Sequence, residues 1–268
     1  MAPLSPYELS VRRAKNWKES VKSLWRTQLT ILILGIVGIC TLLLAFIVGI
    51  NLESLAITMF MSFIGYALFF VVYIFQWIFA VKVKNWATFA PAADQDNIER
   101  VGTTMIIALV LGIVEGFASA IGQFAPDLDS IIQIIASIAT LIVLVIQIVA
   151  FAKLSGSSTL PALAKKGANS MLVYYIVCIA SVVVGVVPVV YGIMTIYSES
   201  IFGGPVFGDT MFILGMSVIF IGVLTSMFFY YRAWWLISKS ELEVLPEDAT
   251  QSVDPIANYY AQSTKIDQ

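Results

Sequence analysis

One acidic side chain, Glu115, falls well inside a long apolar segment and is the clearest candidate in the chain for a chemical role. A carboxylate in a membrane span is costly, and such residues face the interior of a helix bundle or a water-filled cavity. Two interpretations stay open: Glu115 binds a proton or a cation on a transport path, or it is a protonated acid hydrogen-bonded to a neighbouring helix. Ser119 lies one turn further along the same helix face, so it joins Glu115 in the candidate transport site.

Two glutamines, Gln76 and Gln147, occupy matching positions near the ends of two other apolar segments. Each is followed six residues later by a lysine, Lys82 or Lys153, and the two copies lie 71 residues apart. This spacing fits an internal repeat of helical hairpins, or only the shared composition of membrane helices. The two amides either line a vestibule at the inner side of the membrane or are wetted at the interface.

Histidine is absent from the chain, and this excludes several kinds of chemistry. His-ligated haem, HExxH metalloproteases and Ser-His nucleophiles all require it. Cys40 and Cys178 lie in the middle of apolar segments, where thiols are usually small packing residues. No glycine-rich phosphate loop is present either. We therefore expect no enzyme, no metal and no cofactor.

Two further features concern helix packing. Ala108, Gly112, Gly116 and Ala120 form a stripe of small residues at four-residue spacing, which lets another helix backbone come close. That neighbour belongs to the same chain or to a second copy in a homo-oligomer. Pro188 interrupts another apolar segment, where it kinks the helix, either as a hinge in a transporter or without any gating role.

The elements that must position these residues follow from composition. The chain has 268 residues, of which 59% are hydrophobic and 12% are charged. A soluble domain has about 45–50% apolar and about 25% charged residues. Six stretches reach the roughly 20 apolar residues that cross a bilayer: 29–50, 56–81, 101–123, 131–152, 171–197 and 210–237. The fold class expected is all-α, a polytopic membrane helix bundle with six transmembrane helices.

The basic residues predict the orientation of this bundle. All 15 Lys and Arg residues lie in three kinds of place. They precede the first span, lie in or beside the second–third and fourth–fifth connections, or lie close to the end of the sixth span and beyond it. The other three connections contain acidic residues and no Lys or Arg. By the positive-inside rule both termini are cytoplasmic, and the pattern suits a bacterial inner membrane. The net charge of −2 gives no reason to expect a nucleic-acid partner.

The N-terminal segment 1–28 is expected to form an amphipathic helix lying in the plane of the membrane. Ser5-Pro6-Tyr7-Glu8 is a capping box, and apolar residues follow at helical spacing. Such a helix places its rings in the anionic inner leaflet and its cations on lipid headgroups, or it docks on a partner protein. The residues expected at this surface are Arg12, Arg13, Lys15, Trp17, Lys18, Lys22 and Trp25.

The chain is thus divided into the amphipathic helix 1–28, a six-helix domain 29–237 and an acidic and polar cytoplasmic tail 238–268. Three helical hairpins are one possible arrangement of the six-helix domain. All six tryptophans fall on the cytoplasmic side of this arrangement. Because polar residues are scarce inside the spans, the first functional hypothesis is an accessory or assembly subunit. It would dock on a membrane protein partner through its cytoplasmic face. The second is a small transporter or channel, for an ion or a small molecule, that uses Glu115.

Overall fold

The computed structural model describes residues 5–52, 55–122, 126–197 and 205–244. In these ranges the chain is all-helical. Six long helices, each apolar enough to cross a membrane, follow one another along the chain. They are α1 Pro6–Leu52, α2 Leu55–Trp86, α3 Ala92–Gly122, α4 Pro126–Ser155, α5 Ala162–Tyr197 and α6 Pro205–Ser238, with a short 3-10 helix η1 Ala87–Phe89 between α2 and α3. The all-α class and the six long apolar helices are therefore confirmed.

Helix α1 differs from the expectation at its start. The capping box is present, because the Glu8 amide donates to Ser5 Oγ over 3.2 Å and the Ser5 amide donates to Glu8 Oε2 over 2.8 Å. From there α1 runs for 47 residues without a break, so a separate in-plane helix over 1–28 is not supported. The sequence offers no glycine or proline between Pro6 and Gly35 at which the amphipathic part could bend away from the apolar part.

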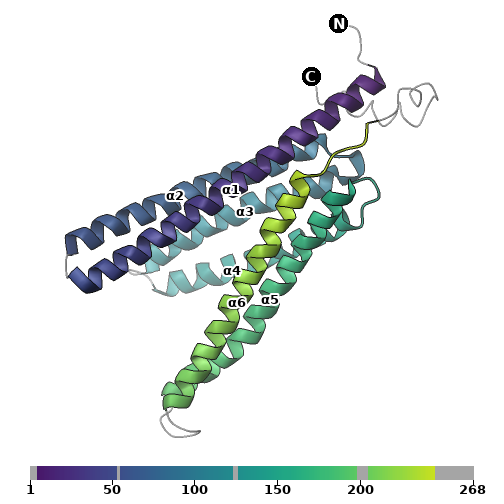
Figure 1. The fold of residues 1–268 in the computed structure, drawn as a ribbon. Coiled ribbons are helices and arrows are strands. Elements are labelled where there is room, and N and C mark those ends of the chain that lie inside the picture. The colour runs from purple at the N-terminus through teal and green to yellow at the C-terminus, as the bar shows by residue number, and fades with distance from the viewer. Residues whose placement is uncertain (1–4, 53–54, 123–125, 198–204, 245–268) are drawn as a thin grey trace.

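The helices are arranged as two arms that diverge from one end (Figure 1). Helices α1, α2 and α3 run together in one arm, α5 and α6 form the other, and α4 packs on α3 and also contacts α5. We call the end where the arms meet the closed end. It contains the start of α1, η1, the α4–α5 connection and residues 239–244. The opposite ends of the helices form the open end.

The hydrophobic core lies at the closed end. Its largest members are Trp17, Trp86 and Trp234, which are almost fully buried, together with Leu24 and Met171. Further from this end, large apolar side chains remain exposed on every long helix; examples are Phe46, Phe63, Phe117, Ile142, Val187 and Phe220. An exposed apolar surface of this extent is unusual for a soluble protein and is compatible with a multi-pass membrane protein.

Glycines bring α5 and α6 into close contact. A Cβ added to Gly215 would lie 2.6 Å from the Gly185 carbonyl oxygen, and one added to Gly222 would lie 2.0 Å from Ser181 Cβ. Only residues without side chains permit two helix backbones to approach this closely. Helix α5 continues through Pro188, so this proline does not end the helix.

Candidate functional site

A cavity of about 390 Å³ lies where the arms meet, and residues of all six helices line it. Its polar wall consists of three glutamines and three tyrosines, namely Gln28, Gln76, Gln147, Tyr174, Tyr230 and Tyr231. Helix α3 contributes Met105, Ala108 and Leu109. We call this space the central cavity. Its volume is within the range of small-molecule sites, and apolar walls with a few polar groups are typical of such sites.

Two hydrogen bonds fix the amides of the central cavity. Gln28 Nε2 donates to the Tyr230 hydroxyl over 2.8 Å, and the Tyr175 hydroxyl donates to Gln147 Oε1 over 2.7 Å. Gln28 is only 2% exposed and Gln147 only 9%. Among the residues that the structure describes, the Gln28 carbonyl oxygen and the Gln147 NH₂ group have no partner. These two buried amides therefore offer one free acceptor and one free donor to a molecule inside.

Aromatic rings separate the central cavity from the closed end. Phe79 packs edge-on against Trp234, with ring centroids 4.8 Å apart, and both side chains are buried. Tyr230 and Tyr174 contact each other beside them in a tilted arrangement, with ring centroids 5.3 Å apart. Beyond this layer, Trp17 contacts Trp86 at 4.8 Å. These rings therefore occupy the space between the cavity and the closed end.

Glu115 lies outside the central cavity. Its side chain is half-buried on α3. Glu115 lies seven residues beyond Ala108, which lines the cavity. This separation of two helical turns, or about 10 Å, places Glu115 on the same helix face but closer to the open end. Within the described part of the chain, no hydrogen bond or ion pair involves Glu115. The side chain of Ser119, one turn further, lies outside the described residues.

The small-residue stripe of α3 makes no close contact with another helix at its two glycines. A Cβ added to Gly112 or Gly116 would meet no atom within 4 Å. The side chain of Ala120 lies outside the described residues, and Ala108 faces the central cavity. One tight helix contact lies instead between α5 and α6, and another joins Gly102 of α3 to the backbone of Lys84 in α2. The sequence signal for the α5–α6 contact was the spacing of small residues. Ser181 lies four residues before Gly185, and Gly215 and Gly222 are two turns apart.

Gln76 and Gln147, proposed from the sequence as possible vestibule residues, lie on the wall of the same cavity. Gln76 is exposed, whereas Gln147 is buried. Sequence reasoning missed Gln28 and the tyrosines of α5 and α6. A signal existed, because the pairs Tyr174-Tyr175 and Tyr230-Tyr231 both fall near the basic ends of their spans.

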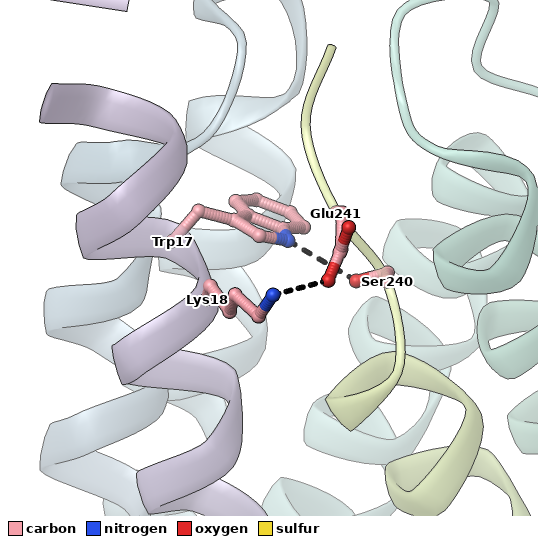
Figure 2. Close-up of polar contacts among 4 residues, drawn as sticks. All are labelled: Trp17, Lys18, Ser240 and Glu241. Atoms are coloured by element: carbon pink, nitrogen blue, oxygen red, sulfur yellow. Dashed lines mark hydrogen bonds and ion pairs between the residues drawn. The ribbon is translucent and has the colours of Figure 1, made fainter. Parts of the chain in front are cut away.

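The residues expected at the lipid surface separate into two groups. Trp17 is buried in the core, and its indole N–H donates to Ser240 Oγ over 3.1 Å (Figure 2). Arg13 donates to the carbonyl oxygens of Phe89 and Ala90 at the end of η1. Trp25 is half-buried, while the side chains of Arg12, Lys15, Lys18 and Lys22 remain exposed. The apolar stripe of this segment therefore packs on protein, and its basic face points outward.

Further polar contacts join the segments of the closed end. Lys18 Nζ lies 2.5 Å from Glu241 Oε1, and this lysine holds the pKa of Glu241 below its ordinary value (Figure 2). The buried carboxylate of Asp94, in the first turn of α3, accepts hydrogen bonds from the hydroxyls of Ser157 and Thr159 in the α4–α5 connection. The first helix, both connections and the segment after α6 thus form one packed unit.

The chain matches no protein family model, no curated protein sequence and no solved structure.

Proposed function

We propose that the chain is a multi-pass protein of a bacterial inner membrane, with the closed end and both termini in the cytoplasm, that transports a small molecule through the central cavity. The observation that supports this proposal is the convergence of three glutamines from three predominantly apolar helices on one cavity. Amides are costly inside a bilayer unless they have partners, and polar residues at such depths line the pathways of transporters.

In this mechanism the Phe79–Trp234 contact would be the inner gate, because the two rings lie on the side of the cavity that faces the closed end. Phe79 belongs to one arm and Trp234 to the other, so a relative movement of the arms would separate the rings and expose the cavity to the cytoplasm. Glu115 lies on the α3 face that continues from the cavity towards the open end. There it would bind the proton or cation that couples to movement of the arms.

The transporter is favoured over the docking subunit by the location of the tryptophans. A cytoplasmic docking surface would present these rings to a partner, since interfaces are enriched in exposed aromatic residues. Trp77 and Trp235 keep exposed surface, but Trp17, Trp86 and Trp234 are buried in the core of the closed end, where they stabilise the fold. These three are consequently not available to a partner.

The test measures whether an aqueous reagent reaches the central cavity from each side of the membrane. Ala108→Cys, in a background with Cys40→Ser and Cys178→Ser, is labelled with a membrane-impermeant maleimide in right-side-out and in inverted vesicles. We expect labelling from both sides. The control is Ile142→Cys, at an exposed position of α4 outside the cavity, which should stay unlabelled. Labelling of Ala108→Cys from one side only would contradict transport, and no labelling would contradict an aqueous cavity.

One observation keeps docking as a second candidate. Arg12, Lys15, Lys22 and Arg26 are all exposed and recur along one outward face of α1. Deleting this segment would remove core residues, so the appropriate variant reverses charge at Arg12, Lys15 and Lys22. A docking subunit would lose a stoichiometric partner in affinity purification of this variant. Recovery of the same partner by the variant and the parent, or of none by the parent, would count against docking.

A further inference from the structure

The depth of the central cavity relates it to one leaflet of the membrane. Gln28 lies two residues beyond Arg26, Tyr231 is adjacent to Arg232, and Gln147 lies six residues before Lys153. At 1.5 Å per residue these separations are at most about 9 Å along the helices. Basic side chains near the ends of membrane helices extend to the headgroup layer. The cavity therefore lies just below that layer, at the depth where the polar part of a lipid meets its acyl chains.

The wall of the cavity selects against charge. None of the described residues that line it is acidic or basic, and its polar groups are amides and phenols. A phosphate or carboxylate placed there would lose its hydration without gaining a counter-charge, which is far more costly than burying a hydroxyl or an amide. The free Gln28 carbonyl oxygen accepts a hydrogen bond and the free Gln147 NH₂ group donates one. A hydroxyl or amide group can satisfy both.

The surroundings of the cavity indicate the route by which its occupant arrives. On the side of the closed end, Phe79 lines the cavity and packs on the buried ring of Trp234. In the other direction the arms diverge (Figure 1). The α3 face that includes Ala108 continues in this direction over Gly112, where an added Cβ would meet no atom within 4 Å. In a membrane, acyl chains fill the space between the arms, and a face of small residues leaves room for them.

We infer that the central cavity binds the uncharged, hydrogen-bonding headgroup of a membrane lipid, whose acyl chains extend between the two arms towards the open end. This inference rests on the proposed function and names its substrate class, an amphiphile of the inner leaflet with a hydroxyl or amide headgroup. Gln28 and Gln147 bind the headgroup, and the tyrosines surround it.

The test uses three matched probes on the full-length protein, delipidated in detergent. Dioleoylglycerol carries an uncharged headgroup, dioleoyl phosphatidate carries the same chains with a charged headgroup, and glycerol has no chains. Native mass spectrometry measures lipid retention, and protection of the Ala108→Cys variant from the maleimide measures occupancy of the cavity. We expect one retained dioleoylglycerol per chain, at least tenfold weaker retention of phosphatidate, and no protection by glycerol.

Variants locate the binding. Gln147→Leu and Gln28→Leu each remove one hydrogen-bonding group from the wall, so each should weaken dioleoylglycerol retention about fivefold, as expected for one hydrogen bond. The control Gln133→Leu makes the same change at an exposed position of α4 outside the cavity and should leave retention unchanged. A variant that fails to fold is recognised because it no longer elutes as a monodisperse peak. If Gln147→Leu fails in this way, Gln147→Glu replaces it, because glutamate keeps the shape of the side chain and adds a charge.

Each outcome has a defined meaning. Equal retention of phosphatidate, equal protection by glycerol, or unchanged retention in the cavity variants would overturn the inference. If the Ala108→Cys variant reacts from both sides of the membrane but dioleoylglycerol is not retained, only the lipid assignment fails. If the variant reacts from one side only, or does not react at all, the proposed function fails with it.

Discussion

Trp17 and Ser240, which are 223 residues apart in the sequence, are joined by a 3.1 Å hydrogen bond from the indole N–H to the serine hydroxyl (Figure 2). Trp17 belongs to α1 in one arm, and Ser240 directly follows α6 in the other. The adjacent residues form the Lys18–Glu241 ion pair. This pair of contacts holds the arms together at the closed end, so the stability of the protein should depend on residues that the sequence suggested were in contact with lipid.

The first prediction concerns Trp17. Trp17→Ala should lower the free energy of unfolding by about 3–5 kcal/mol, because it creates a cavity in the core. Ser240→Ala should cost about 1 kcal/mol, the usual contribution of one hydrogen bond. Thermal unfolding in detergent measures both. Trp235→Ala is the control, because Trp235 is 46% exposed. An equal loss for the Trp17 and Trp235 variants would contradict a buried role for Trp17.

The second prediction compares glycines in two helices. Gly215→Ala should destabilise the α5–α6 pair, because its Cβ would lie 2.6 Å from the Gly185 carbonyl oxygen. Gly112→Ala has open space around it and should be neutral or stabilising by up to about 1 kcal/mol, the difference in helix propensity between the two residues. The unfolding midpoint of each variant gives the answer. Destabilisation by Gly112→Ala comparable to that by Gly215→Ala would show that the α3 stripe packs against a neighbour.

The third prediction is a pH dependence at the Lys18–Glu241 ion pair. Because Lys18 lowers the pKa of Glu241, the pair contributes its full stability above the ordinary pKa of this glutamate, 4.5, and loses it as the pH falls through the lowered pKa. The unfolding midpoint of the parent should therefore exceed that of Glu241→Gln at neutral pH by a small amount. The two should converge in acid. Both side chains are exposed, so salt should also reduce the difference. A difference that is unchanged in acid would contradict the ion pair.

The fourth prediction concerns the buried carboxylate of Asp94. Asp94→Ala leaves the hydroxyls of Ser157 and Thr159 without their acceptor and should cost about 1–3 kcal/mol. It should also release the α4–α5 connection, so limited proteolysis between Ser155 and Ala162 should accelerate. The control is Asp96→Ala, two residues further along α3, where the side chain is exposed. Equal rates of cleavage in both variants would show that Asp94 does not hold this connection.

Much of the fold could be predicted from the sequence, because six apolar runs of bilayer length leave few alternatives. The start of α1 could not. Its spacing of apolar residues shows that one face is buried, and that face would look the same against lipid or against protein. Only the position of Trp86 and Ser240, contributed by distant segments, distinguishes the two environments.

The candidate site was predicted in part. Gln76 and Gln147 were identified from their matching depths, and both reach the cavity. Their partners were not identified, because helix rotation decides whether a tyrosine near the end of a span faces a neighbour or the lipid. The small residues of α3 show the same limitation. Their spacing allows close packing but does not require it, and close contacts occur instead at Gly102 of α3 and at Gly185 and Gly215.

The central claim is that the cavity at the junction of the arms is occupied by a specific molecule, and photocrosslinking tests it most directly. A benzophenone amino acid replaces Met105, which lines the cavity, and in a second protein it replaces Ile142, which does not. Both proteins are irradiated in cell membranes, and the adduct masses are measured. We predict one discrete lipid adduct with an uncharged headgroup at position 105, and a mixture of bulk phospholipids at position 142. The same phospholipid mixture at both positions, or no adduct at position 105, would contradict the claim.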